Sequence, residues 1–191
     1  MMTNLNLGAT TLSTNLTSAN TNLSTTITAS TFNGWKKTSG SETSTSAEFI
    51  PVSGTDSTSG TAYGTLYNYC AASAGTICTS SNSSNAAYDL CPAGWRLPTR
   101  NEFTTLYSNA SYNTNAKMRA SIANGGAAFA LAGFCDSTPA SQGSEGFYWS
   151  STRYDSTIMY GLHLTTSGVN QSGVYRRLTG SSIRCVLKAT A

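Results

Sequence analysis

The sequence predicts an α+β fold built from two short helices, several short strands and long polar loops. Both helices fall within residues 99–123, while residues 127–188 hold short apolar segments separated by Gly, Ser and Asn. A pair of helices followed by a half made of strands and loops is typical of the α+β class. Only 10% of the residues are charged, against about 25% in ordinary soluble domains, so Ser, Thr, Asn and Gly must keep the chain in solution.

The first predicted helix has a specific start signal. Thr99 is followed three residues later by Glu102, which is the pattern of a capping box. Pro92 and Pro98 keep the preceding segment extended, because proline cannot sit in a helix interior. We expect the helix to end near Asn109. Its apolar face carries Phe103, Leu106 and Tyr107.

The second predicted helix spans residues 115–123. It would bury Met118 and Ile122 and end at the Gly125–Gly126 pair, since glycine readily adopts the left-handed conformation that closes a helix. No further helix is predicted after it.

Two strands are predicted from a period of two in apolar residues, which places alternate side chains on opposite faces. In the first strand three side chains should face the core: Tyr160, Leu162 and Leu164. Their neighbours should face outward: Gly161, His163 and Thr165. In the last strand Ile183, Cys185 and Leu187 should face one way and Arg184 the other.

Residues 1–60 are predicted to be an extension and linker, and residues 61–191 a single folded domain. The extension has one apolar helical stripe, formed by Leu12, Leu16, Ala19, Leu23 and Ile27. Two interpretations stay open: residues 1–31 either join copies of the chain into a homo-oligomer or pack along the domain as a leader. Within the linker, residues 49–52 are expected to form an edge strand because Pro51 cannot donate to a central ladder.

The five cysteines favour disulfides over a metal site. No Cys-x-x-Cys pair occurs and His163 is the only histidine, so zinc ligands are missing and no metal is expected. Cys70 and Cys78 would close a small loop, and Cys91 and Cys185 would join the two ends of the domain. Cys135 is left over as a small buried hydrophobe, with a reactive thiol as the alternative.

Three ordered segments carry a resemblance to a known family. They are Cys-Pro-Ala-Gly-Trp-Arg-Leu-Pro-Thr at residues 91–99, Tyr-Trp-Ser-Ser-Thr at 148–152 and Ile-Arg-Cys-Val at 183–186. Over residues 61–188 the chain resembles the Fibrobacter succinogenes major paralogous domain. That resemblance implies a C-type-lectin-like fold of the formylglycine-generating-enzyme branch, with paired N- and C-terminal strands, two helices and a loop-rich binding face.

The same scaffold is used by the variable proteins of diversity-generating retroelements, in which a C-terminal region is changed at adenines of a template. The resemblance therefore implies a variable region at about residues 147–187. Asn codons of the AAY type can change to many residue types, among them Tyr, Ser, Thr, Ile, His, Gly and Val, but not to Met or Gln, so Met159 and Gln171 should be fixed. The predicted ligand-binding positions are Tyr154, Thr157, Ile158, Gly161, His163, Thr165, Gly173, Val174, Tyr175 and Ser181.

Other functions are disfavoured by what the sequence lacks. A single His offers no catalytic triad, and no glycine-rich phosphate loop is present, so we expect neither enzyme activity nor a cofactor. The net charge of +3 is thinly spread, which disfavours nucleic acid as a partner. No stretch reaches the roughly 20 apolar residues of a membrane span.

The sequence therefore predicts a non-enzymatic receptor-type protein that binds a protein or surface ligand through diversified residues. The alternative is a fixed adhesion or glycan-binding module of the same fold. An extracellular or cell- or virus-surface location is expected from the cysteines and the polar composition, although no leader is visible in residues 1–30.

Overall fold

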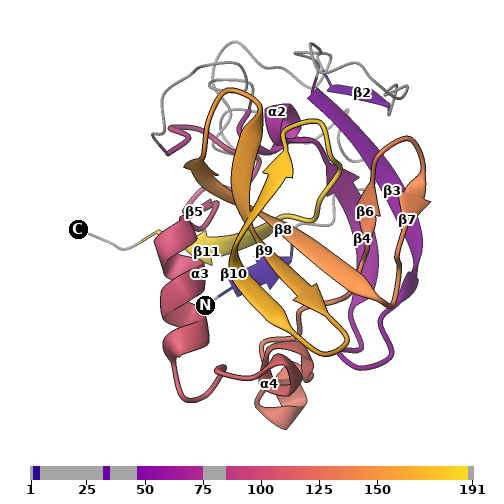
Figure 1. Cartoon of the computed structure of the whole chain (residues 1–191), viewed down its shortest axis with the longest axis vertical. Coiled ribbons are helices and arrows are strands. Elements are labelled where there is room, and N and C mark those ends of the chain that lie inside the picture. Colours follow the sequence, from indigo (N-terminus) through magenta and orange to yellow (C-terminus); the bar gives the residue numbers. More distant parts are fainter. Residues whose placement is uncertain (1, 5–31, 35–46, 75–84, 189–191) are drawn as a thin grey trace.

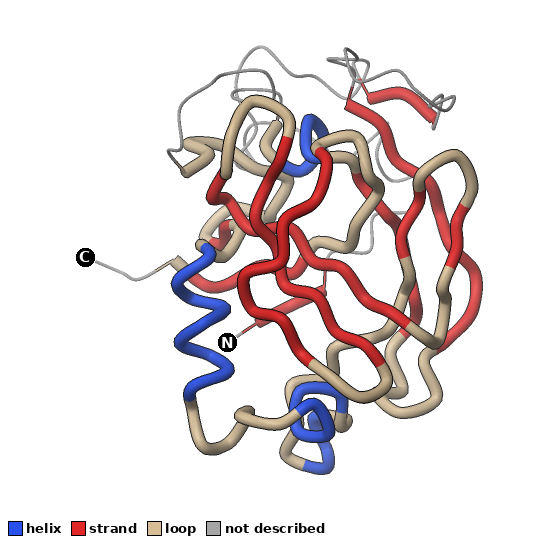
Figure 2. Tube along the Cα trace, viewed as in Figure 1, coloured by secondary structure: helices blue, strands red, loops and turns tan. Residues whose placement is uncertain are grey.

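A computed structural model describes residues 2–4, 32–34, 47–74 and 85–188 of the chain. Within these ranges the protein is a small α+β domain with few helices and several small, mainly antiparallel sheets, as predicted. Figure 1 shows the longest helix, α3 (Arg100–Ser108), standing along one side of the strands, and α4 (Asn115–Arg119) lying at one end of the domain. The strands fill the middle of the molecule (Figure 2).

The two ends of the described chain meet in one sheet. Strand β11 (Arg184–Leu187) lies between β1 (Met2–Asn4) and β5 (Trp95–Arg96), and both pairings are antiparallel. The family resemblance implied such a pairing within residues 61–188, whereas the N-terminal strand that pairs with β11 lies in residues 2–4, which were predicted to belong to the extension.

A second sheet, which we call the central sheet, has the strand order β10-β9-β8. It consists of β8 (Glu145–Arg153), β9 (Ile158–Thr165) and β10 (Val169–Arg176), all antiparallel. Each pairing contains a register shift, between Trp149 and Arg153 on β8 and between Asn170 and Gly173 on β10. Such bulges increase the local twist of a sheet.

The third sheet includes residues that the composition assigns to a linker. Its order is β2 (Phe32–Gly34), β3 (Ala47–Thr55) and β4 (Ala62–Tyr67), with β2 parallel and β4 antiparallel to β3. The predicted edge strand is thus the middle strand over residues 47–49. From Ile50 onward β3 pairs with β4 alone, so one edge of β3 is unpaired at Pro51. Proline, which has no backbone N–H, is tolerated at such an edge. A two-stranded sheet joins β6 (Phe134–Cys135) to β7 (Pro139–Ala140).

The first predicted helix is confirmed in detail. The Thr99 side chain accepts from the Glu102 N–H, the Glu102 side chain accepts from the Thr99 N–H, and the helix closes at Asn109. Glu102 also accepts a hydrogen bond from the Arg96 guanidinium at 2.7 Å. The Arg96 contact, aided by the Thr99 N–H, holds the pKa of Glu102 below its usual value.

The second predicted helix is wrong in its length. After α4 the chain leaves the helix at Ala120, and residues Ile122–Asn124 form a separate 3-10 turn closed by left-handed Gly125. Met118 is buried as expected, but Ile122 is 70% exposed because the break turns it away from the core. A four-residue helix, α2 (Tyr69–Ala72), was not predicted; the Asn68 side chain caps its N-terminus.

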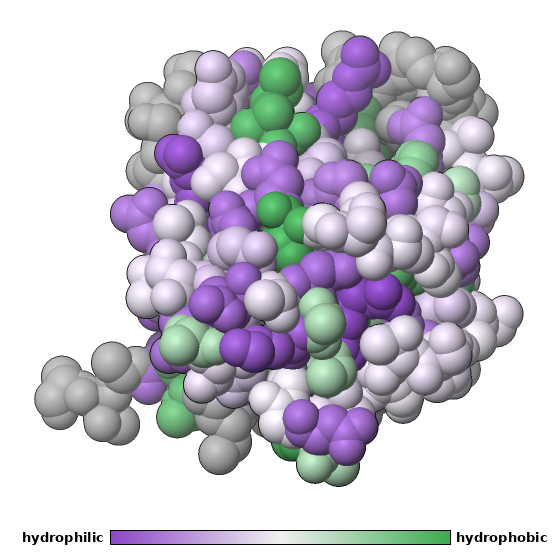
Figure 3. Space-filling view, turned by 60° about the horizontal axis from the view of Figure 1, so that its bottom comes forward, coloured by the Kyte–Doolittle hydropathy of each residue, from purple (hydrophilic) through white to green (hydrophobic). Residues whose placement is uncertain are grey.

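Three groups of buried side chains hold the domain together. The first surrounds Trp149 and the Cys91–Cys185 disulfide, the second lies between α3 and the central sheet, and the third surrounds Leu66 and Cys135. Trp149 is fully buried and its indole N–H donates to the Tyr67 carbonyl at 2.7 Å, which confirms a core role. Figure 3 shows one face of the molecule, where neutral and hydrophilic residues predominate and hydrophobic ones form small separate groups.

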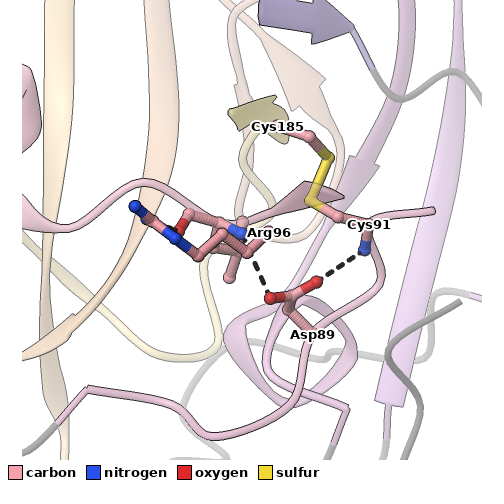
Figure 4. Close-up of a disulfide and its surroundings, with 5 residues drawn as sticks. Asp89, Cys91, Arg96 and Cys185 are labelled. Carbon is pink, nitrogen blue, oxygen red and sulfur yellow. Dashed lines mark hydrogen bonds between the residues drawn. A yellow bond between two sulfur atoms is a disulfide. The ribbon is translucent and has the colours of Figure 1, made fainter. Parts of the chain in front are cut away.

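The predicted disulfide between Cys91 and Cys185 is present and spans 94 positions of the sequence. Beside it the buried Asp89 carboxylate accepts the N–H groups of Cys91 and Leu97, at 2.9 and 3.1 Å, and so fixes the segment that leads into α3 (Figure 4). Cys70 is also disulfide-bonded, whereas its predicted partner Cys78 lies outside the described residues, as do residues 5–31 with the apolar stripe. Cys135 is buried, as the small-hydrophobe interpretation predicts.

Candidate ligand-binding surface

One face of the central sheet, which we call the α3 face, is covered by α3 over only part of its length. Leu162 and Leu164 on β9 are fully buried there and pack with Phe103 of α3. Their predicted inward orientation is confirmed. Because α3 has nine residues, it is only about 13 Å long, and it covers this face of the sheet only as far as its first residue, Arg100.

Beyond Arg100 the side chains on the same face are exposed or half-buried. The side chains that lie there form what we call the Tyr154 surface: Arg100, Tyr154, Ile158, Tyr160, Val174 and Arg176. Tyr160 and Val174 are opposite each other on β9 and β10, as are Ile158 and Arg176. Tyr154 and Val174 are among the most exposed large apolar side chains of the described chain, at 53% and 47%.

Aromatic rings and cations are in direct contact on this surface. The rings of Tyr154 and Tyr160 meet edge to face, with their centroids 5.4 Å apart. The Arg100 guanidinium lies over the Tyr160 ring, 4.3 Å from its centroid, and its Nε donates to the Ser172 hydroxyl at 3.0 Å. These contacts hold Tyr160 and Arg100 in place before any ligand binds.

The Asp155 carboxylate, next to Tyr154 in the sequence, is engaged in a turn. Asp155 accepts the N–H groups of Thr157 and Ile158 at 2.7 and 2.8 Å, and the same bonds hold its pKa below the usual value. Asp155 therefore shapes the turn between β8 and β9, and Arg100 and Arg176 contribute the cationic character of the surface.

On the opposite face of the central sheet a second aromatic group is partly buried. The His163 ring stacks on Phe147 at 4.2 Å, and its Nε2 lies 3.4 Å from the Glu145 carboxylate. Tyr175 packs edge-on against Phe147, at 4.8 Å between centroids, and burial together with Glu145 raises the pKa of its phenol. His163 and Tyr175 are thus held by neighbours and are less available than the sequence predicts.

The structure separates the ten predicted positions into three groups. Tyr154, Thr157 and Val174 are exposed, and Ile158, His163, Thr165 and Tyr175 are half-buried. Gly161, Gly173 and Ser181 are buried. Met159, predicted to be fixed, is fully buried beside Trp149.

The outward orientation predicted for Gly161 is wrong because Tyr175 covers that side of the strand. A Cβ added at Gly161 would lie 2.6 Å from the Tyr148 carbonyl oxygen and 3.4 Å from the Tyr175 ring. At Gly173 it would lie 2.0 Å from the Tyr175 hydroxyl. Ser181 is buried because its segment pairs with Tyr67 through two backbone hydrogen bonds of 2.9 Å. These three positions have no side-chain access to a ligand.

Three members of the Tyr154 surface are not among the ten predicted positions: Arg176, Tyr160 and Arg100. Tyr160 was predicted to face the core, and it does share a face with Leu162, but it is only half-buried at its position. Arg100 carried no signal beyond its place at a helix start. Only the position of the N-terminus of α3 over the sheet reveals Tyr160 and Arg100.

A family model described as the Fibrobacter succinogenes major domain matches residues 11–187. The chain belongs to this family. The match begins far N-terminal of residue 61, where the resemblance was expected to start, so the family domain includes the region of β2 and β3. No curated protein and no solved structure matches the chain.

Two hollows lined by described residues lie apart from the Tyr154 surface. One, of about 360 Å³, lies between α3 and β11 around Phe103 and Leu187; the other, of about 180 Å³, lies around Asp89 and Lys188.

Among the described residues no group of three or more His, Cys, Asp and Glu side chains is placed to hold a metal ion. None of the helices in these ranges has the length and apolar character of a membrane span.

Proposed function

We propose that this chain is a non-enzymatic binding domain that recognises a macromolecular ligand through the Tyr154 surface, and that a retroelement diversifies this surface. The observation that carries the proposal is a clustering: Tyr154, Ile158 and Val174, three predicted variable positions, belong to the Tyr154 surface, and a fourth, Thr157, is exposed in the adjoining turn between β8 and β9. The neighbouring Leu162 and Leu164 are core residues. Substitution at the four positions would change the contact surface without opening the core.

The scaffold fits a C-type-lectin-like domain. Strands β1 and β11 pair, and the short helices α3 and α4 flank the sheets. These are the features that the family resemblance implies. The Cys91–Cys185 disulfide supports an oxidising location, outside the cell or on a cell or virus surface.

The chemistry of the surface supports binding of a protein or another large ligand. Tyrosine gives a large contact area with few rotatable bonds, so that ordering it costs little entropy. Tyr160 is already fixed by Arg100, which reduces that cost further. Side chains of this kind dominate the affinity of many protein interfaces.

The diversification is tested by the DNA that flanks the gene. We expect a near-identical repeat, differing only at adenines, beside a reverse transcriptase gene. The differing codons should include those for Tyr154, Thr157, Ile158 and Val174 and should spare Gly161 and Leu162. If no such repeat exists, or if its differences fall mainly on buried positions, the retroelement proposal is wrong.

A fixed glycan-binding module is the second candidate, because exposed rings such as Tyr154 also stack on sugars. A glycan array distinguishes the two. Binding to a single sugar class that is lost in Tyr154→Ala and retained in Tyr88→Ala would favour the glycan module. Tyr88 is a matched control because it is 43% exposed and lies outside the Tyr154 surface.

A further inference from the structure

Strand β10 has a neighbour on one side only. It is the last strand in the order β10-β9-β8, so its outer edge is not paired within the central sheet. An unpaired edge offers backbone N–H and C=O groups to another strand. The edge borders the Tyr154 surface, because Val174 and Arg176 belong to both.

The hydrogen-bond register shows which backbone groups point outward. Arg177 N–H donates to the Thr157 carbonyl at 2.8 Å, which makes these two residues a hydrogen-bonded pair. In an antiparallel ladder such pairs alternate with non-hydrogen-bonded ones. In the register of β9 and β10, Val174 opposite Tyr160 is therefore a non-hydrogen-bonded pair.

A separate contact supports this assignment. The Tyr160 carbonyl accepts the Ser150 hydroxyl at 2.8 Å, so it points toward β8 and away from Val174. The Val174 N–H and C=O accordingly face the free edge. Among the described residues, no backbone hydrogen bond outside the strand ladders involves either group.

We propose that an extended segment of a partner protein adds a strand to β10 and pairs with the backbone of Val174. This inference rests on the proposed function and names the form of its ligand. Alternate side chains of the added strand would lie on the α3 face, next to the Tyr154 surface. The residue opposite Val174 would be apolar and the one opposite Arg176 acidic, since Arg100 and Arg176 give this face its charge.

Charge also opposes self-association through the same edge. Two copies paired antiparallel across β10 would share one sheet face, on which Arg100 and Arg176 of both copies would gather. Like charges opposite each other destabilise strand pairing. A partner with acidic residues at alternate positions avoids this repulsion.

The test compares two substitutions of Val174. Val174→Pro removes the outward N–H and leaves the pairing with β9 intact, because that pair has no hydrogen bonds and proline is tolerated on edge strands. Val174→Ala removes most of the side chain and keeps the N–H. The probe is a displayed library of random short peptides, selected on the unchanged protein.

We expect selection of peptides with apolar and acidic residues at alternate positions. Their affinity should fall about tenfold or more in Val174→Pro relative to Val174→Ala, as for loss of a hydrogen bond with an unsatisfied partner group. Equal affinity of the two variants, or no selected peptide, would overturn strand addition. Concentration-dependent dimers of the unchanged chain that disappear in Val174→Pro would overturn it too.

The outcomes separate this inference from the proposed function. If Tyr154→Ala loses peptide binding while Val174→Pro and Val174→Ala bind alike, the surface is correct and the added strand is wrong. If Val174→Pro lowers the urea midpoint, its loss of binding could reflect lower stability, and amide hydrogen exchange of the unchanged protein then provides the test. Bound peptide must slow exchange of the Val174 N–H in the unchanged protein, and unchanged exchange would reject the proposal.

Discussion

Removal of the Cys91–Cys185 disulfide should lower the free energy of unfolding by an amount set mainly by chain length. The cross-link joins positions separated by 94 residues. Closing a loop of this size restricts the unfolded chain and is worth about 4.5 kcal/mol in the chain-entropy model. A loss of that size is a large part of the total stability of about 5–15 kcal/mol of a typical domain.

The double variant Cys91→Ala/Cys185→Ala also removes two buried sulfur atoms, so the packing loss must be measured separately. Cys135→Ala is a matched control because Cys135, like the other two, is fully buried. It should cost about 1 kcal/mol, as for a small buried group. The loss in the double variant, after subtraction of twice the control value, estimates the effect of the cross-link.

Urea unfolding followed by tryptophan fluorescence, without reductant, gives these values. We expect a corrected loss of about 4 kcal/mol; a double variant that is unfolded in buffer agrees with this. A corrected loss below about 1 kcal/mol would refute the argument that this bridge acts by restricting the unfolded chain.

Three further predictions concern single residues. Gly161→Ala should lower the urea midpoint more than Gly173→Ala. The methyl group added at Gly161 meets the Tyr148 backbone carbonyl, whereas the one added at Gly173 meets the side chain of Tyr175, which can shift. Equal losses in the two variants would contradict this prediction. Burial alone would raise the pKa of Asp56, but backbone N–H donors and Arg119 hold it below its usual value. The ionised Asp56 carboxylate should therefore stabilise the fold above about pH 4, and this stabilisation should be lost as the pH falls through the lower folded-state pKa. Unfolding free energies measured from about pH 7 to about pH 2 should show this loss in the unchanged protein and not in Asp56→Asn. Arg184 is buried over the Phe129 ring, and among the described residues its Nε and Nη1 have no hydrogen-bond partner. Arg184→Met should leave stability unchanged or raise it by about 1 kcal/mol, and a thermal melt that shows a loss of that size would contradict the prediction.

The sequence alone was sufficient where the deciding interaction is local or covalent. The start of α3 was predicted because Thr99 and Glu102 cap each other three residues apart. The inward orientation of Leu162 and Leu164 followed from the period of a strand. The Cys91–Cys185 bridge was predicted from the positions of these residues at the two ends of the domain.

Tertiary structure alone decided which parts of each sheet face are covered. A period of two shows that Tyr160 shares a face with Leu162, but not that α3 ends between them. In the same way Gly161 is buried by Tyr175 from the neighbouring strand. Exposure depends on the length and position of elements distant in sequence, and so the sequence predicted several residues of the candidate surface while the fold determined where that surface lies.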